Sequence, residues 1–177
     1  IVPDNAGWKR RSTVALGRAD TAALVATLEH PNGWHRDTAS RLLYERQDKA
    51  AVPLLAKLVR ESKSALARHH ALGSLDGLGA LDEATILTAL GDSDEHVRER
   101  AVYLSEKVMA GQSLSPALAS RLVGLANDPA DRVRFQLALT SETALSNAAT
   151  KTAAAPLASA YARIAARDSG NTWISAA

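Results

Sequence analysis

The feature that most constrains the fold is a short recurring pattern, an arginine followed three residues later by a small residue. Its occurrences are Arg36 with Ala39, Arg68 with Ala71, Arg98 with Ala101, and Arg134 with Leu137 and Ala138 at the small place. The arginines lie 32, 30 and 36 residues apart. A period of this length accommodates two helices and two turns, so the pattern predicts a repeat protein built from stacked helical pairs.

The composition favours helices over strands. The chain has 36 Ala and 24 Leu, against 14 Val and Ile together and seven aromatic residues. Ala and Leu are strong helix formers, whereas β-branched and aromatic side chains favour strands. Val97, Ala101, Leu104 and Val108 also share one face of a helix. The sequence therefore predicts an all-α fold, a right-handed α-solenoid of about four helical pairs plus a truncated fifth.

The repeat divides the chain into units. We expect residues 1–19 to be a linker from a preceding domain and residues 20–177 to form the repeat domain. The expected units are about 20–47, 48–79, 80–110, 114–147 and a truncated 153–177. The expected helices are 20–29, 35–47, 50–61, 64–75, 82–90, 94–109, 116–126, 129–146, 153–167 and the beginning of one from 171.

Two dipeptides mark expected helix starts. Ser115-Pro116 and Asp128-Pro129 each place a capping side chain before a proline. Proline is favoured at the first helical position because the N–H that it lacks has no partner there. We therefore expect helices to begin at Pro116 and at Pro129.

An aspartate precedes two of the arginines by six positions, Asp92 before Arg98 and Asp128 before Arg134. Each aspartate is placed to reach the arginine that follows it or to cap the second helix. We interpret the aspartates and arginines as a structural ladder that joins neighbouring units rather than as catalytic groups. The ladder residues are Arg36, Arg68, Asp92, Arg98, Asp128 and Arg134. The acidic place of the other units holds His30, Ser62 and Asp168.

The turn Asp-x-x-x-x-Val-Arg-x-x-Ala between two helices, at this period, resembles the HEAT-repeat family over about residues 20–177. The strings HPNGWHRDTASRLLYER (30–46), ARHHALGSLDGLGAL (67–81) and RVRFQLAL (132–139) are similar, more narrowly, to a helical segment of bacterial membrane-bound dehydrogenase or PVC-type haem-binding proteins. In that family the segment lies between a β-propeller and a cytochrome c-like module with a CxxCH haem site. The resemblance implies an excised part of a larger redox protein, located in the periplasm or outside the cell.

The residues of the segment itself indicate no catalytic site, cofactor site or metal site. The chain has no cysteine and therefore no CxxCH motif. His69 and His70 are adjacent in an expected helix, so their side chains point about 100° apart and cannot bind one metal ion from the same face. His30 and His35 flank a turn without a third ligand in the sequence. We expect this segment not to be an enzyme, and the activity of a parent protein stays open.

The charge balance bears on two hypotheses for function. The first is a non-catalytic scaffold or spacer whose partner is a protein. The alternative is a HEAT-like DNA-binding protein or DNA glycosylase, which needs a strongly basic face. The chain has 21 Lys and Arg against 19 Asp and Glu, so we expect no nucleic acid as partner. We also expect no membrane insertion, because no apolar run approaches about 18 residues.

A mixed aromatic, histidine and arginine strip is expected along the second helices of the units. In unit three it lies one residue before the apolar face of the helix, and equivalent positions recur in the other units. The candidate interaction residues are Trp34, Arg41, His70, His96, Arg100, Tyr103, Arg132 and Gln136. Such a composition is typical of protein-contact surfaces, although an ordinary solvated helix face gives the same pattern.

Overall fold

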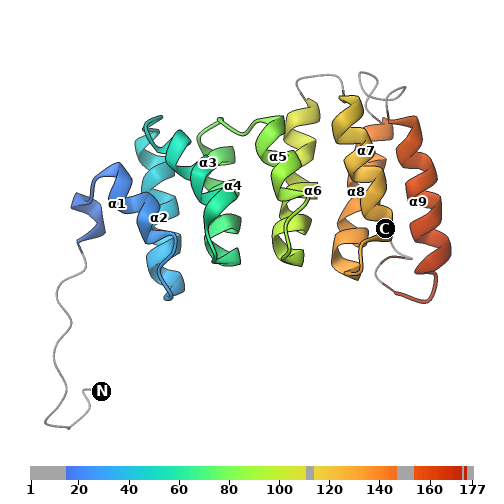
Figure 1. The fold of residues 1–177 in the computed structure, drawn as a ribbon, viewed down its shortest axis with the longest axis horizontal. Helices are drawn as coiled ribbons and strands as arrows, with labels where there is room; N and C mark the ends of the chain where they lie inside the picture. The colour runs from blue at the N-terminus through green and yellow to red at the C-terminus, as the bar shows by residue number, and fades with distance from the viewer. Residues whose placement is uncertain (1–14, 111–113, 147–153, 173, 175–177) are drawn as a thin grey trace, which may run out of the picture.

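The computed structural model describes residues 15–110, 114–146, 154–172 and 174, and these residues form helices and turns without any strand (Figure 1). The α-helices are α1 (Thr21–Thr27), α2 (Gly33–Arg46), α3 (Ala51–Glu61), α4 (Ala65–Gly77), α5 (Glu83–Ala89), α6 (Glu95–Ala110), α7 (Pro116–Gly124), α8 (Asp131–Ser146) and α9 (Ala155–Arg167). Two short 3₁₀ helices are η1 (Leu16–Arg18) and η2 (Leu125–Asn127). The prediction of an all-α solenoid is confirmed.

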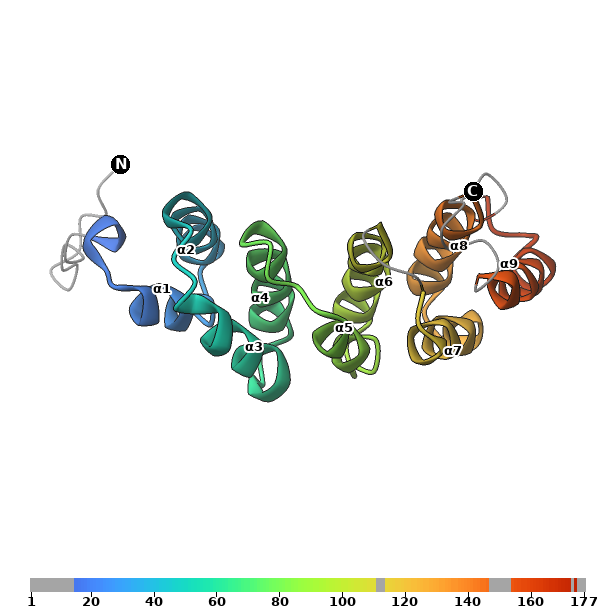
Figure 2. The ribbon, with the colours of Figure 1, turned by 90° about the horizontal axis from the view of Figure 1, so that it is seen from above.

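The helices form two layers. Figure 2 shows α2, α4, α6 and α8 side by side in one layer and α1, α3, α5 and α7 in the other. Within each layer a helix packs against its equivalent in the next unit, as α2 does on α4 and α1 on α3. The last helix, α9, packs on α7 and α8 and begins a fifth unit. The layer of second helices lies on the inner side of a shallow curve (Figure 2).

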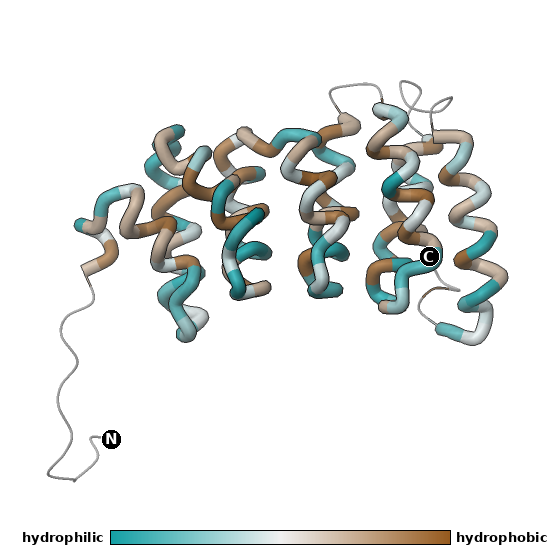
Figure 3. The backbone as a smooth tube through the Cα atoms, viewed as in Figure 1, coloured by the Kyte–Doolittle hydropathy of each residue, from teal (hydrophilic) through white to brown (hydrophobic). Residues whose placement is uncertain are grey.

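The core lies between the two layers and runs the length of the stack. Figure 3 shows apolar and polar segments alternating along the helices, as expected for helices with one buried face. The small residues of the repeat pattern, Ala39, Ala71 and Ala101, are fully buried. An alanine at this place lets the backbones of neighbouring helices approach closely, which explains why the pattern requires a small side chain there.

Local capping determines where several helices begin. Asp20, Ser64, Asp82 and Ser115 each accept a hydrogen bond from a backbone amide in the first turn of the helix that follows. The expected start at Pro116 is therefore confirmed. These caps satisfy amides that have no partner within the helix.

The expected start at Pro129 is wrong, because α8 begins two residues later at Asp131. Asp128 does not cap the helix. Its Oδ1 accepts from the Ala130 amide in the turn before the helix, and its carboxylate also binds an arginine of the preceding unit. The Asp128 carboxylate therefore stabilises the turn before α8 and binds Arg98 at the same time.

Among the described residues, no helix is long and apolar enough to cross a membrane.

Candidate functional site

The arginines of the second helices bind carboxylates of the following unit. In α6, Arg98 donates from Nε and Nη2 to the two carboxylate oxygens of Asp128, at 2.7 and 2.8 Å. Arg68 binds Asp92 through the same two nitrogens. Arg134 likewise binds Asp168. Paired hydrogen bonds of this kind fix both the distance and the orientation of the two groups, so they hold each unit in place on the next.

The expected pairing within one unit is wrong. Arg98 does contact Asp92, but through Nη1 and the main-chain carbonyl oxygen, at 2.9 Å. The Asp92 carboxylate accepts instead from Arg68 and, within its own turn, from the Asp94 amide. The arginine therefore anchors the turn of its own unit with one nitrogen and holds the next unit with the other two.

The ladder lacks one carboxylate, at the junction of the first and second units. Arg36 donates from Nη1 to the carbonyl oxygens of His30 and Pro31, as the other arginines do in their own units. The acidic place of the next unit holds Ser62, whose hydroxyl donates to Glu29. Arg36 Nε is buried without a hydrogen-bond partner. At this junction the arginine keeps its hydrogen bonds to the backbone carbonyls of its own unit but forms no ion pair with the described residues of the next unit.

The ion pairs determine the charge state of the aspartates. Burial by itself raises the pKa of Asp92 and of Asp128, but hydrogen bonds from their partner arginines and from backbone amides outweigh it, so both pKa values lie below the ordinary value. The hydrogen bond from Arg134 lowers the pKa of Asp168. The three carboxyls are therefore ionised at neutral pH, as a ladder of ion pairs requires.

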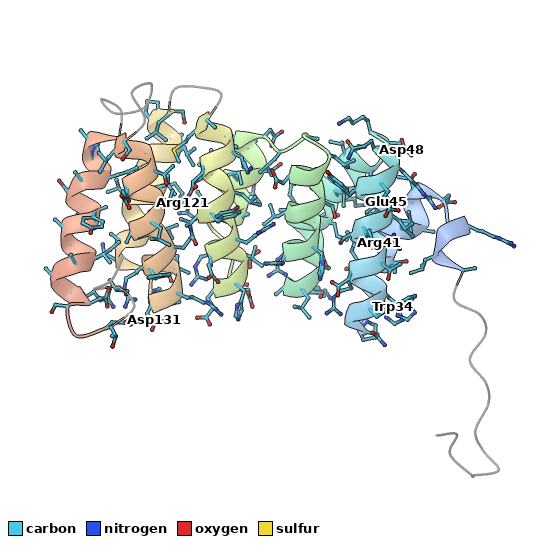
Figure 4. The ribbon with its side chains drawn as sticks, turned by 180° about the vertical axis from the view of Figure 1, so that it is seen from behind. Trp34, Arg41, Glu45, Asp48, Arg121 and Asp131 are labelled. Atoms are coloured by element: carbon cyan, nitrogen blue, oxygen red, sulfur yellow. The ribbon has the colours of Figure 1, made fainter. Side chains whose placement is uncertain are left out.

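Two adjoining hollows lie along the second helices, with volumes of about 510 and 300 Å³. They share His69 and Arg100 in their linings, and we call them together the inner groove. The lining of the larger hollow includes Arg41, Tyr44, Leu66, His70, Gly73 and Gly77. The lining of the smaller hollow includes His96, Glu99, Tyr103 and Gln136. Figure 4 views this side of the molecule, with Arg41 and Glu45 following Trp34 along α2.

Most of the expected interaction strip lies in this groove. The exceptions are Trp34 and Arg132, which line neither hollow. The Trp34 ring stands edge-on to His35 at the beginning of α2, with 5.1 Å between ring centroids. Arg132 binds Glu99 at 2.9 Å. The middle of the strip thus lines the groove, while Trp34 contacts its neighbour in sequence and Arg132 contacts Glu99 and His96 of α6.

Sequence reasoning missed the glycines that open the groove. A Cβ atom on Gly73 would come 3.4 Å from Arg100 Nη2, and one on Gly77 would come 3.0 Å from Tyr44 Cδ2. Gly73 and Gly77 are four residues apart and share one face of α4, so their lack of side chains lets groups of α2 and α6 reach that face. Two glycines four residues apart inside an expected helix are a sequence signal from which the close approach of neighbouring side chains to this helix could have been predicted.

The two adjacent histidines of α4 have different surroundings. His70 lies beside α2, where its Nδ1 is 3.3 Å from Ser40 Oγ and its Nε2 is 3.9 Å from Asp37. Burial lowers the pKa of His69, and the positive charge of Arg100 lowers it further. Burial also lowers the pKa of His70. Both rings are therefore neutral at pH 7 and act as hydrogen-bonding groups rather than as cations.

A third hollow, of about 880 Å³, lies on the other layer between α5 and α7. Its lining includes Asp92, Arg98 and Asp128, whose charged groups are already bound within the ladder. In the part of the chain that the structure describes, no group of three or more His, Cys, Asp or Glu residues lies close enough to hold a metal ion. The inner groove is therefore the better candidate for a functional site.

Comparison with known families places this geometry in context. The family model for HEAT repeats matches residues 21–105, from α1 to most of α6. No curated protein matches the chain. The matched span includes the first three helical pairs and the whole of the larger hollow of the inner groove.

Proposed function

We propose that this chain is a non-catalytic interaction scaffold whose protein partner binds along the layer of second helices. HEAT repeats over residues 21–105 support this function class. The observation that carries the proposal is that most of the exposed large apolar side chains lie on the second helices. Among the residues that the structure describes, four of the six exposed large apolar side chains belong to second helices, namely Trp34, Tyr44, Leu66 and Tyr103, with exposed fractions of 56%, 61%, 56% and 41%. Exposed aromatic and aliphatic side chains beside arginines are typical of protein contacts.

The ladder supports the same proposal through rigidity. Three bidentate ion pairs fix successive units relative to one another. A surface that is already ordered loses less conformational entropy when a partner binds than a mobile one. A rigid inner face spanning several units is therefore suited to a partner that contacts more than one unit.

The test is site-specific photo-crosslinking in the source organism's extract. A photoreactive phenylalanine replaces Tyr44 or Tyr103 on the second-helix side, and Leu54 of α3 serves as a matched exposed control on the other layer. We expect a discrete crosslinked protein from the two tyrosine positions and none from Leu54. Equal crosslinking from all three positions, or crosslinking to nucleic acid alone, would contradict the proposal.

We also propose that the scaffold belongs to a larger redox protein. The support is the similarity of the three quoted strings at 30–46, 67–81 and 132–139 to the helical segment of dehydrogenase and haem-binding proteins. The test is the coding sequence on either side of this segment. A β-propeller upstream and a CxxCH motif downstream are the expected result, and a contiguous reading frame with neither would refute it.

A further inference from the structure

We propose that the inner groove binds an acidic peptide segment, with Arg100 receiving a carboxylate and with Tyr44 and Leu66 contacting the apolar side chain beside it. The inference rests on the proposed function, because it names the chemistry of the partner at the same surface. Four observations carry it: an arginine without an acceptor, a second unsatisfied polar atom, the charge of the lining, and the small residues of α4.

Arg100 is the cation of the groove that lacks an acceptor. Its Nε is buried without a hydrogen-bond partner, and within the described residues the guanidinium makes no hydrogen bond or ion pair. It lies over the Tyr103 ring, with 5.3 Å from Cζ to the ring centroid. The neighbouring Arg41 and Arg132, in contrast, each bind a carboxylate. A buried donor without an acceptor is unfavourable, and a ligand carboxylate would relieve that cost.

The hydroxyl of Ser74 is the second unsatisfied group. Ser74 Oγ is buried without a hydrogen-bond partner and belongs to the lining of the larger hollow, which also includes Arg100. Buried polar side-chain atoms normally have partners, so this hydroxyl is a second donor without an acceptor in the lining of the same hollow. Both groups can donate, as a carboxylate requires.

The charge of the lining favours an anion. Arg41 and Arg100 line the larger hollow, and no carboxylate does so among the residues that the structure describes. Of the acidic side chains beside the groove, Glu45 binds Arg41 and Glu99 binds Arg132, whereas Asp37 lies 3.9 Å from His70 Nε2. In the larger hollow an acidic segment therefore meets one unpaired guanidinium, and the described residues that line this hollow include no carboxylate.

The apolar part of the lining favours a peptide over nucleic acid. Tyr44 of α2 and Leu66 of α4 both line the hollow, and both are strongly exposed. A phosphate track needs several unpaired cations in a row, because affinity for nucleic acid grows with the number of phosphates that are neutralised. One unpaired arginine beside two large apolar side chains is instead complementary to a peptide in which an acidic residue is next to an apolar one.

The glycines of α4 set the shape of the site. Gly73 and Gly77 form part of the floor of the hollow, where the lack of their side chains lets Arg100 and Tyr44 come close to the backbone of α4. A volume of about 510 Å³ holds a few side chains of an extended segment rather than a folded domain. The contact is therefore a short anchor within a longer interface.

The experiment is a selection from a random library of 12-residue peptides on the whole chain, followed by fluorescence anisotropy with the selected peptides. We expect Asp and Glu to be enriched next to aromatic or aliphatic residues. Arg100→Gln should weaken binding at least tenfold, as should replacing the peptide's Glu with Gln. Arg121→Gln, an exposed arginine on α7, is the matched control and should leave binding unchanged. Thermal unfolding of each variant verifies that it is folded.

Several outcomes would overturn the inference: no selected peptide, selected peptides without acidic enrichment, equal binding by wild type and Arg100→Gln, or tighter binding of a random single-stranded DNA than of the peptide. The crosslinking experiment separates this failure from failure of the scaffold function. If Tyr44 and Tyr103 still crosslink to a protein while acidic peptides do not bind, the surface is an interaction site for a partner of different chemistry. If both experiments fail, the function itself is wrong.

Discussion

Arg98 binds Asp128 of the following unit with two hydrogen bonds and donates with its remaining terminal nitrogen to the main chain of Asp92 in its own turn. One side chain thus joins two consecutive turns of the solenoid. Because Arg68 and Arg134 repeat the arrangement, the contact recurs at three junctions between units. At the junction between the first and second units Ser62 takes the place of the aspartate, and the ion pair is missing there.

The first prediction is that replacing a ladder arginine lowers the free energy of unfolding more where the arginine binds an aspartate than where it binds only backbone carbonyls. Arg98→Ala leaves Asp128 buried without its partner, since the side chains are 12% and 3% exposed. We expect it to lower the free energy of unfolding by about 3 kcal/mol. Arg36→Ala removes only hydrogen bonds to backbone carbonyls and should cost about 1 kcal/mol. Urea denaturation of the two variants measures the difference, and equal losses would show that the ion pair contributes little.

The second prediction is that the incomplete junction can be completed. In Ser62→Asp the new carboxylate takes the ladder place opposite Arg36, whose Nε is buried without an acceptor. Glu29, which now accepts from Ser62, would repel it, so the change is made in a Glu29→Gln background. We expect the double variant to be about 1 kcal/mol more stable than Glu29→Gln alone.

Urea denaturation of these variants measures that gain. Arg36→Ala in the same background is the control, because it removes the cation that the new aspartate needs. A gain that persists without Arg36 would mean that the aspartate acts through the local turn and not through the ladder.

Much of the fold could be predicted from the sequence because each repeat unit carries the same features. The period, the buried alanine and the abundance of helix formers each recur, so the expected helix 50–61 differs from the observed Ala51–Glu61 by one residue at its start. The helix start expected at Pro129 was wrong because Asp128 accepts from the Ala130 amide in a turn before α8, and the Asp-Pro dipeptide alone does not distinguish that turn from a helix cap.

The partner of each arginine and the depth of the groove depend on distances between units, which sequence spacing does not contain. Asp92 is six residues from Arg98 and 24 from Arg68, yet the carboxylate binds the distant arginine. Similarly, Tyr44 of α2 lies close to Gly77 of the neighbouring helix α4. The strip from Arg41 to Gln136 was predictable because it follows from helical periodicity within each unit.

The third prediction concerns pH. Burial holds the pKa of His69 and His70 below the ordinary value of about 6.5, so the unfolded chain binds more protons than the folded chain just below that pH. Stability should be constant above about pH 6.5 and should decrease as the pH falls through this window. A second decrease should follow below about pH 4, where the ladder aspartates, with lowered pKa values, become protonated.

Free energies of unfolding from urea denaturation between pH 8 and pH 3 measure both decreases. The double variant His69→Gln, His70→Gln should lose the decrease below pH 6.5 and retain the one below pH 4. Stability that rises as the pH falls from 7 to 5 would mean that the two rings gain a favourable charge in the folded state, contrary to their burial.

The fourth prediction separates the groove from the fold. Gly73 lies inside α4 with ordinary helical geometry, so Gly73→Ala should raise the free energy of unfolding by about 0.5–1 kcal/mol through lower backbone entropy in the unfolded chain. The new methyl group comes within 3.4 Å of Arg100 Nη2, a tolerable contact for the folded protein. It nevertheless occupies the floor where the proposed carboxylate meets Arg100, so peptide affinity should fall although stability rises.

Thermal unfolding and peptide anisotropy on the same preparation measure the two effects of Gly73→Ala. Gly124→Ala, at the end of α7 and with no atom near an added Cβ, is the matched control and should leave affinity unchanged. A change in which stability and affinity rise together would contradict the placement of the ligand over Gly73. Gly73 would then be needed neither for packing nor for binding, because alanine would improve both stability and affinity.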